Sequence, residues 1–165
     1  MKKIHKFTKN FCEEVIDNLS TLEMGIMQYK NEPVENTDLK VMLNQPSSAN
    51  IWEVNDLEII NEVKQIILKE IPNVDSFVCN VLRLDNTKKN EEHVDTSDYT
   101  VIVLLNDNFS GGNLIVKKQN MGLEIGDLFY FPSSYKHYVE PVLSGQRYTL
   151  VLFVSLNKKN KKTLI

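Results

Sequence analysis

The stretch that decides the fold runs from His93 to Arg147 and reads HVDTSDYTVIVLLNDNFSGGNLIVKKQNMGLEIGDLFYFPSSYKHYVEPVLSGQR. Within it, residues 99–105 are a nearly continuous run of apolar and β-branched residues, which is typical of a strand covered on both faces. Glycines separate this run from later ones and permit backbone conformations that other residues resist. The stretch therefore predicts strands joined by glycine-containing turns.

Strand signals extend on both sides of this stretch. The predicted strands are residues 77–84, 99–105, 113–117, 127–131, 137–140 and 147–155, with turns at 106–112 and 121–127. Strands do not alternate with helices, and no internal repeat is present. At least six strands with glycine turns between them favour a jelly roll or a sandwich.

The N-terminal half shows helical spacing instead. Residues 8–22 are predicted to form a helix capped by Thr8. Residues 30–50 are predicted to be loop, or at 39–43 a short strand, and Trp52 is expected to pack rather than to bind.

A second helix is predicted to begin at Asn55 or Asp56 and to end at Ile71-Pro72, because a residue before proline disfavours the helical conformation. Its predicted buried face consists of Leu57, Ile60, Val63, Ile67 and Ile71.

Length and composition allow one ordinary domain. The chain has 165 residues, of which 42% are hydrophobic and 25% charged, so it can bury a core. No apolar segment follows the basic start, and no run approaches the roughly 18 apolar residues of a membrane helix. Cys12 and Cys79 are the only cysteines and form no disulfide framework. We therefore expect a cytoplasmic protein without a membrane segment.

Charge is placed unevenly. Residues 1–9 and 158–162 carry four lysines each and no acid, which leaves 11 of the 19 basic residues against all 22 acidic ones. Surfaces that bind nucleic acid are basic, so this acidic centre argues against such a partner. The lysine-rich ends are expected to be solvated, with contact to an acidic partner as the alternative.

Residue types that bind metals stand at both ends of the deciding stretch. His93 and Asp95 are two residues apart, so on a strand end their side chains share one face. His137 is expected to come from the opposing sheet. Two histidines and one carboxylate are the ligand set of non-haem Fe(II) sites that keep open positions. The chain has only one other histidine, His5.

Arg147 begins an apolar strand ten residues after His137. Only Arg83 and Arg147 are arginines among the 19 basic residues. A guanidinium is costly to bury without an anion, and its planar fork suits a carboxylate. By itself Arg147 could be an edge residue that reaches solvent, but its spacing from His137 favours a role in binding a carboxylate.

Five pieces of the sequence occur in a characteristic order. They are His93-x-Asp95, Leu104–Asp107, Phe109–Gly112, Gly126–Phe131 and His137-x3-Pro141-Val142-x2-Gly145-x-Arg147. Through them the chain resembles the Fe(II)/2-oxoglutarate-dependent dioxygenase superfamily, and within it the prolyl 4-hydroxylase-like branch. The resemblance implies a mainly β fold with N-terminal helices, in which a double-stranded β-helix (jelly roll, cupin-like barrel) is buttressed by two helices.

The resemblance also implies roles for single residues. His93, Asp95 and His137 would hold Fe(II) and form the catalytic centre, and Arg147 with Thr149 would bind 2-oxoglutarate. The further reactant is O2, with ascorbate as a reductant, and the products from 2-oxoglutarate are succinate and CO2. Halogenating relatives replace the aspartate by a small residue, so Asp95 favours hydroxylation of an unactivated C–H bond.

The sequence departs from the family ahead of His93. Collagen-type prolyl hydroxylases usually carry Tyr-x2-Gly-x2-Tyr there, whereas this chain has Leu84, Thr87 and Asn90. A tyrosine that helps to bind 2-oxoglutarate is therefore absent or replaced. By resemblance the expected substrate is a prolyl residue in a peptide or protein, and Arg83 would face that substrate or pair with an acid. The alternative is another amino-acid residue or a free small molecule.

Two hypotheses of other classes stay open, a non-catalytic jelly-roll binding module and a cupin-type metal enzyme. Cupins usually have HxH where this chain has His93-x-Asp95, and a binding module gives no reason for the spacing of His137 and Arg147. The polar loop 85–92 is expected at the site mouth, as a solvated connection or a substrate lid. We predict a single domain over 1–165, divided into a helical support region (1–75), a catalytic jelly-roll core (76–157) and a basic tail (158–165).

Overall fold

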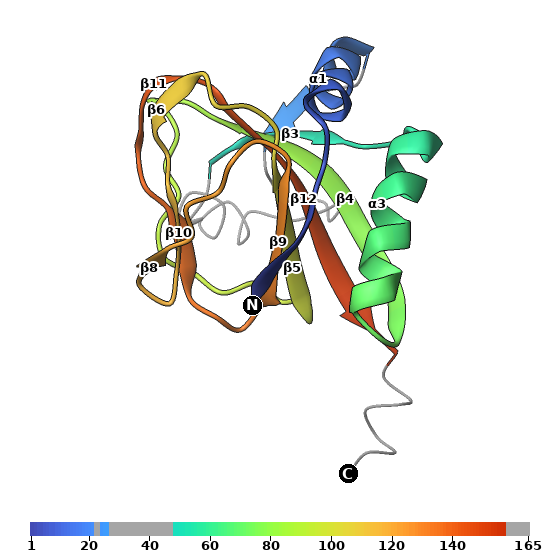
Figure 1. Ribbon diagram of the computed structural model, residues 1–165. Coiled ribbons are helices and arrows are strands. Elements are labelled where there is room, and N and C mark those ends of the chain that lie inside the picture. The colour runs from blue at the N-terminus through green and yellow to red at the C-terminus, as the bar shows by residue number, and fades with distance from the viewer. Residues whose placement is uncertain (22–23, 27–47, 158–165) are drawn as a thin grey trace, which may run out of the picture.

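The largest part of the fold is a seven-stranded antiparallel sheet with the order β1-β9-β5-β12-β4-β3-β2 (Figure 1). It is seen in a computed structural model that describes residues 1–21, 24–26 and 48–157. The strands are β1 (Lys2–Lys6), β2 (Met24–Ile26), β3 (Asn50–Glu53), β4 (Val74–Leu84), β5 (Tyr99–Leu104), β9 (Asp127–Pro132) and β12 (Arg147–Leu156). The central pair is β4 with β12, whose register runs without a break from Arg147 opposite Leu84 to Ser155 opposite Ser76.

Two smaller sheets face one side of the large sheet (Figure 1). One holds β10 (His137–Val139), β7 (Leu114–Val116) and β8 (Gln119–Asn120), and the other holds β11 (Val142–Gly145) and β6 (Phe109–Gly111). A buried apolar cluster fills the space between the layers and consists of Ala49, Leu84, Ile102, Leu114, Val116, Phe129, Phe131, Val139, Val142 and Val151. This arrangement confirms the predicted jelly roll.

The helices cover the opposite side of the large sheet (Figure 1). They are α1 (Lys9–Asp17), which continues as a 3-10 turn (Asn18–Thr21), and α3 (Leu57–Glu70). Their apolar faces pack on a second core, which includes Phe11, Val15, Ile59, Val63, Ile67, Val81, Val101, Val103, Leu128, Leu150 and Leu152. The large sheet is therefore buried on both faces, as the apolar run at residues 99–105 predicts.

The two predicted helix caps are confirmed. Thr8 accepts a hydrogen bond from the Phe11 amide, and Asp56 accepts from the Glu58 and Ile59 amides. The first helix is shorter than predicted because the chain tightens into the 3-10 turn after Asp17. Leu57 was wrongly assigned to the buried face of the second helix: it is 72% exposed, and Ile59 is buried instead.

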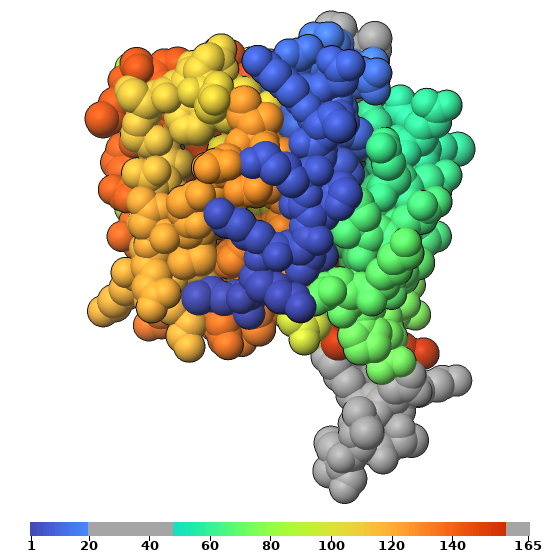
Figure 2. Space-filling view, in the orientation of Figure 1, coloured from blue at the N-terminus to red at the C-terminus, as the bar shows by residue number. Residues whose placement is uncertain are grey.

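The N-terminal lysines are part of the sheet, which the sequence did not indicate. β1 pairs with β9, and its lysines contact acidic residues of the same chain: Lys2 lies 2.6 Å from Glu70, Lys3 lies 3.3 Å from Asp127, and Lys6 lies 2.7 Å from Glu124. Figure 2 shows the N-terminal residues as a blue band between the orange β9 region and the green α3. The region at 1–75 thus supplies strands as well as helices. The lysine side chains of β1 are exposed to solvent, as expected, but they also pair with acidic residues of the same chain.

Short strands account for the other differences. β6 lies inside the predicted turn at 106–112, and β11 was not predicted, because three- and four-residue strands with glycine carry little apolar pattern. The short strand proposed at 39–43 lies outside the described residues. In the part of the chain that the structure describes, none of the helices has the length and apolar character to cross a membrane.

Gly126 joins the N-terminal strand to the core and provides a stability test. Its φ is +84°, and an added Cβ would lie 2.2 Å from the Phe7 carbonyl oxygen. Gly122 also has a positive φ, +57°, but an added Cβ would meet nothing within 4 Å. We expect Gly122→Ala to lower the free energy of unfolding by about 1 kcal/mol through backbone strain alone, and Gly126→Ala to lower it by about 3 kcal/mol or more. Urea denaturation of both variants measures the difference, and equal losses would contradict the role of the Phe7 contact.

Candidate metal centre

His93 and His137 are backbone neighbours. The His93 amide donates to the His137 carbonyl at 3.0 Å, and the His137 amide donates to the His93 carbonyl at 2.9 Å. His137 begins β10 in a small sheet, whereas His93 and Asp95 lie in an extended segment outside the regular strands. The sequence predicted that His137 would come from an opposing sheet, but in fact the segment of His93 pairs directly with β10. The Asp95 amide is held by the Ser133 carbonyl at 2.9 Å.

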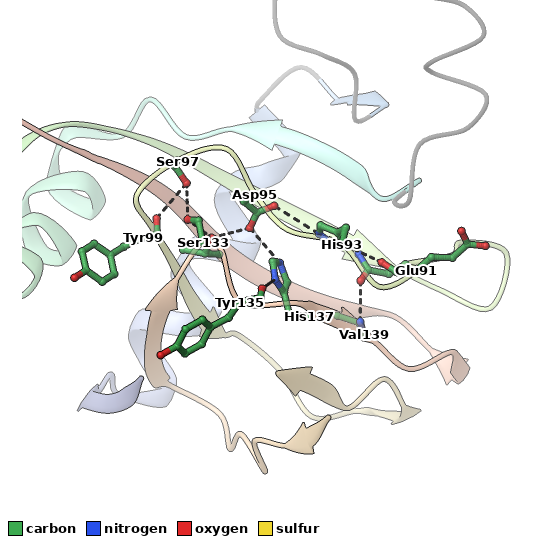
Figure 3. A network of polar contacts seen from close by, with 11 residues as sticks. Glu91, His93, Asp95, Ser97, Tyr99, Ser133, Tyr135, His137 and Val139 are labelled. Carbon is green, nitrogen blue, oxygen red and sulfur yellow. Dashed lines mark hydrogen bonds and ion pairs between the residues drawn. The ribbon is translucent and has the colours of Figure 1, made fainter. Parts of the chain in front are cut away.

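The three predicted ligands converge on one point (Figure 3). One side-chain ligand atom from each of His93, Asp95 and His137 lies within 4.8 Å of the other two. The two carboxylate oxygens of Asp95 lie 3.6 Å from His93 Nε2 and 3.1 Å from His137 Nε2. Two imidazoles and one carboxylate at these separations could hold a divalent metal ion.

Each histidine is oriented by a carbonyl group on its other side. His93 Nδ1 lies 2.6 Å from the Glu91 carbonyl oxygen, and His137 Nδ1 lies 2.8 Å from the Tyr135 carbonyl oxygen. A carbonyl can only accept, so each Nδ1 carries the proton and each Nε2 presents its lone pair. Histidines that bind metals are commonly held in this way.

Burial and neighbouring polar groups shift the pKa values of His93 and Asp95. Burial lowers the pKa of His93, which favours the neutral imidazole that a metal requires. Burial by itself would raise the pKa of Asp95, but the adjacent His137, the hydrogen bond from Thr100 and the nearby His93 outweigh it, and the net shift is downward. The site is thus arranged as an anionic carboxylate beside a neutral His93.

The three side chains lie in the wall of a cavity of about 220 Å³ between the large sheet and the small sheets. Most of the remaining wall is apolar, with residues such as Leu82, Ile102, Leu114, Val151 and Phe153. Arg147 and Thr149 of β12 line the same cavity. The structure therefore brings together the five residues that the sequence assigned to iron and 2-oxoglutarate.

Arg147 is a buried cation with unused donor capacity. It is 3% exposed, and its Nε has no hydrogen-bond partner in the part of the chain that the structure describes. No residue in the described ranges forms an ion pair with it. Burial lowers the pKa of Arg147 to about 10, so it stays protonated at neutral pH. Gly112 leaves room for its stem, because an added Cβ there would lie 3.0 Å from Arg147 Cδ. A buried guanidinium in a cavity is a site for an anionic ligand.

Arg83 is not brought to the site. It precedes Leu84 on β4, and side chains alternate along a strand, so Leu84 lines the cavity while Arg83 points to the other face. There its guanidinium lies 5.2 Å from the Trp52 ring and donates to Asn50 Oδ1 at 3.4 Å. Arg83 therefore does not line this cavity, and its predicted role in facing a substrate or pairing with an acid stays a prediction, whereas Trp52 packs as predicted.

The loop at 85–92 is attached to its surroundings near its end. The Ser48 amide donates to the Lys89 carbonyl at 3.1 Å, and the Lys89 amide donates to Ser48 Oγ at 3.0 Å. Asn90 Oδ1 accepts from the Val139 amide at 2.7 Å, and Asn90 also lines the cavity. These bonds favour a fixed wall over a lid.

Comparison with known protein families finds a match to the segment that contains this centre. A family model described as the 2OG-Fe(II) oxygenase superfamily, where 2OG is 2-oxoglutarate, matches residues 79–155. Over these residues, which are somewhat less than half of the chain, the protein is similar to that superfamily. The matched segment runs from β4 to β12 and includes His93, Asp95, His137, Arg147 and Thr149. The matched family uses Fe(II), 2-oxoglutarate and O2, and the donor set of the cavity fits the first two. No curated protein matches the chain.

Several solved structures have a similar fold. A 2OG-Fe(II) oxygenase family oxidoreductase from Burkholderia pseudomallei is 16% identical, with a TM-score of 0.59 over 87% of this chain and 78% of that one. A Pseudomonas putida prolyl-4-hydroxylase is 14% identical, with a TM-score of 0.55 over 88% and 99% of the two chains. A Trichoplax adhaerens prolyl hydroxylase, solved with a hypoxia inducible factor peptide, is 15% identical, with a TM-score of 0.54 over 94% and 93%.

Proposed function

We propose that this protein is an Fe(II)- and 2-oxoglutarate-dependent dioxygenase that hydroxylates an unactivated C–H bond. The observation that carries the proposal is the placement of Arg147 in the same cavity as His93, Asp95 and His137. Arg147 is a buried cation that forms no ion pair with any of the described residues. One cavity thus offers a ligand set for Fe(II) and a separate site for the far carboxylate of a diacid. Residues 76–157, from β4 to β12, form the proposed catalytic core.

Each side chain has a distinct part in this proposal. Nε2 of His93, Nε2 of His137 and the carboxylate of Asp95 hold Fe(II), and the carbonyls behind the histidines keep Nε2 directed inward. Arg147 grips the far carboxylate of 2-oxoglutarate, with a further hydrogen bond from the Thr149 hydroxyl. When bound, Fe(II), 2-oxoglutarate and O2 supply the oxidant for C–H hydroxylation, with release of succinate and CO2. The apolar wall excludes water from that oxidant.

The proposed substrate is a prolyl residue in a peptide or protein. This is supported by the similar fold of two prolyl hydroxylases, one of them solved with a peptide. Another amino-acid residue or a free small molecule is the alternative substrate, and ascorbate is the proposed reductant. Both cysteines are buried and unpaired, which fits the reducing environment of the cytoplasm as the proposed location.

Anaerobic titration of the Fe(II)-loaded protein with 2-oxoglutarate tests the proposal. We expect a visible metal-to-ligand charge-transfer band that is absent in Asp95→Ala. If Fe(II) binds but no band appears, a cupin-type metal enzyme that does not use 2-oxoglutarate is the better explanation. If Fe(II) does not bind, the protein is a binding module with the same fold.

A further inference from the structure

Three hydroxyl groups form a chain behind Asp95 (Figure 3). Thr100 Oγ1 lies 2.6 Å from Asp95 Oδ2, Ser133 Oγ lies 2.9 Å from Thr100 Oγ1, and Ser97 Oγ lies 2.8 Å from Ser133 Oγ. Thr100 is 2% exposed and Ser133 is fully buried. None of the three residues belongs to the ligand set, and no sequence pattern indicates them because they lie up to 36 positions apart.

The number of available protons determines which hydroxyl donates and which accepts in each hydrogen bond of this hydroxyl chain. Each hydroxyl has one proton, and an ionised carboxylate can only accept, so Thr100 donates to Asp95. Thr100 has then used its proton, so in the contact between Thr100 and Ser133 the donor must be Ser133. By the same reasoning Ser97 donates to Ser133. The alternative for Ser97, donation to the Tyr99 carbonyl, has the longer distance of 3.3 Å. All three short contacts are therefore satisfied only when every donor points toward Asp95.

The hydroxyl chain is also anchored by hydrogen bonds of the backbone. The Asp95 amide donates to the Ser133 carbonyl at 2.9 Å, and the Ser133 amide donates to the Asp98 carbonyl at 3.0 Å. Ser133 thus holds the segment of Asp95 with its main chain and supports Thr100 with its side chain. Thr100 itself lies on β5, a central strand of the large sheet. A carboxylate without such a partner could rotate about its terminal bond, which has only a weak torsional preference.

We propose that Thr100, supported by Ser133 and Ser97, is a positioning residue that fixes the carboxylate of Asp95 for metal binding. This inference rests on the proposed function, since it requires Asp95 to be a metal ligand. Removing an outer partner of a metal ligand typically weakens metal binding or activity by about 10–100-fold. The hydroxyl of Thr100 is the outer partner of Asp95, as the two carbonyls are the outer partners of the histidines.

Titration of the full chain with Mn(II), with free Mn(II) followed by electron paramagnetic resonance, tests this without turnover. We expect Thr100→Val, which keeps the side-chain volume, to weaken Mn(II) binding by about 10–100-fold. Thr100→Ser, which keeps the hydroxyl, should bind within about threefold of the original protein, and Ser97→Ala should lose roughly two- to threefold because it acts at the end of the chain. Ser144→Ala is the control, since it removes a hydroxyl from an exposed Ser110–Ser144 pair outside the cavity.

The outcomes distinguish a failure of the positioning role from a failure of the proposed function. If Thr100→Val binds Mn(II) as well as the original protein does, the positioning role is wrong and the metal site stands. If Thr100→Ser loses as much as Thr100→Val, the loss does not follow the hydroxyl, and the inference is likewise wrong. If the original protein binds no Mn(II) or Fe(II), both the inference and the proposed function fail. Should Thr100→Val not fold, Thr100→Ala removes the same hydroxyl and is measured instead.

Discussion

His137→Ala is expected to abolish Fe(II) binding and turnover while the protein remains folded. Loss of one of three ligands should weaken metal binding by more than the roughly 100-fold that loss of an outer partner can cause. The His137 ring is 5% exposed and lies 4.7 Å from the Phe131 ring, so its removal also leaves a void in the core between the sheets. Some loss of stability is therefore expected together with the loss of metal.

Val139→Ala separates these two effects. Val139 lies on the same short strand, is also buried and lines the same cavity, but it offers no ligand atom. We expect it to lower the thermal unfolding temperature and to leave Fe(II) affinity unchanged. Calorimetric metal titration and thermal denaturation of both variants measure this. If His137→Ala lost its fold but kept its metal affinity, the assignment of His137 as a ligand would be refuted.

Arg147→Met should remove 2-oxoglutarate binding and spare metal binding. Loss of a buried charged hydrogen-bond partner costs about 2–5 kcal/mol of binding free energy. In the absence of 2-oxoglutarate the same variant should be as stable as the original protein or more so, because an unpaired buried cation is replaced by an apolar chain. Thermal denaturation with Mn(II), in the presence and absence of 2-oxoglutarate, gives both quantities.

Arg83→Met is the matched control for this prediction. It is the same chemical change one strand away, but on the face that points to Trp52 rather than to the cavity. It should leave 2-oxoglutarate binding unchanged. If Arg147→Met lost Mn(II) and 2-oxoglutarate binding to the same extent, Arg147 would have a structural role instead.

The sequence predicted elements whose stability comes from their own apolar pattern. The runs at 99–105 and 147–155 became the central strands β5 and β12, and Thr8 and Asp56 cap the helices as expected. The strand β1 was missed because its sequence, KKIHK, contains a single large apolar residue. This strand is stabilised by pairing with β9 and by ion pairs to acidic residues about 70 to 120 positions away. A local sequence pattern cannot indicate such distant contacts.

The same distinction applies to the site. His137 and Arg147 lie ten residues apart within one short segment. Their roles, as metal ligand and as carboxylate-binding residue, could therefore be predicted from the sequence. Arg83 could not be separated from Arg147 by composition, because only the strand register decides which of them shares a face with the cavity. Thr100 and Ser133 become neighbours only after β5 pairs with β9, where Thr100 lies opposite Phe131.

The strict alternation along β12 has a consequence for protein engineering. Arg147, Thr149 and Val151 line the cavity, whereas Leu150 and Leu152 between them belong to the core beneath the helices. Thermostability could therefore be raised by redesigning the helix-facing positions while the reaction chamber is kept unchanged. A single-residue deletion within β12 would do the reverse, because it would exchange the two sets and place leucines where the cosubstrate should bind.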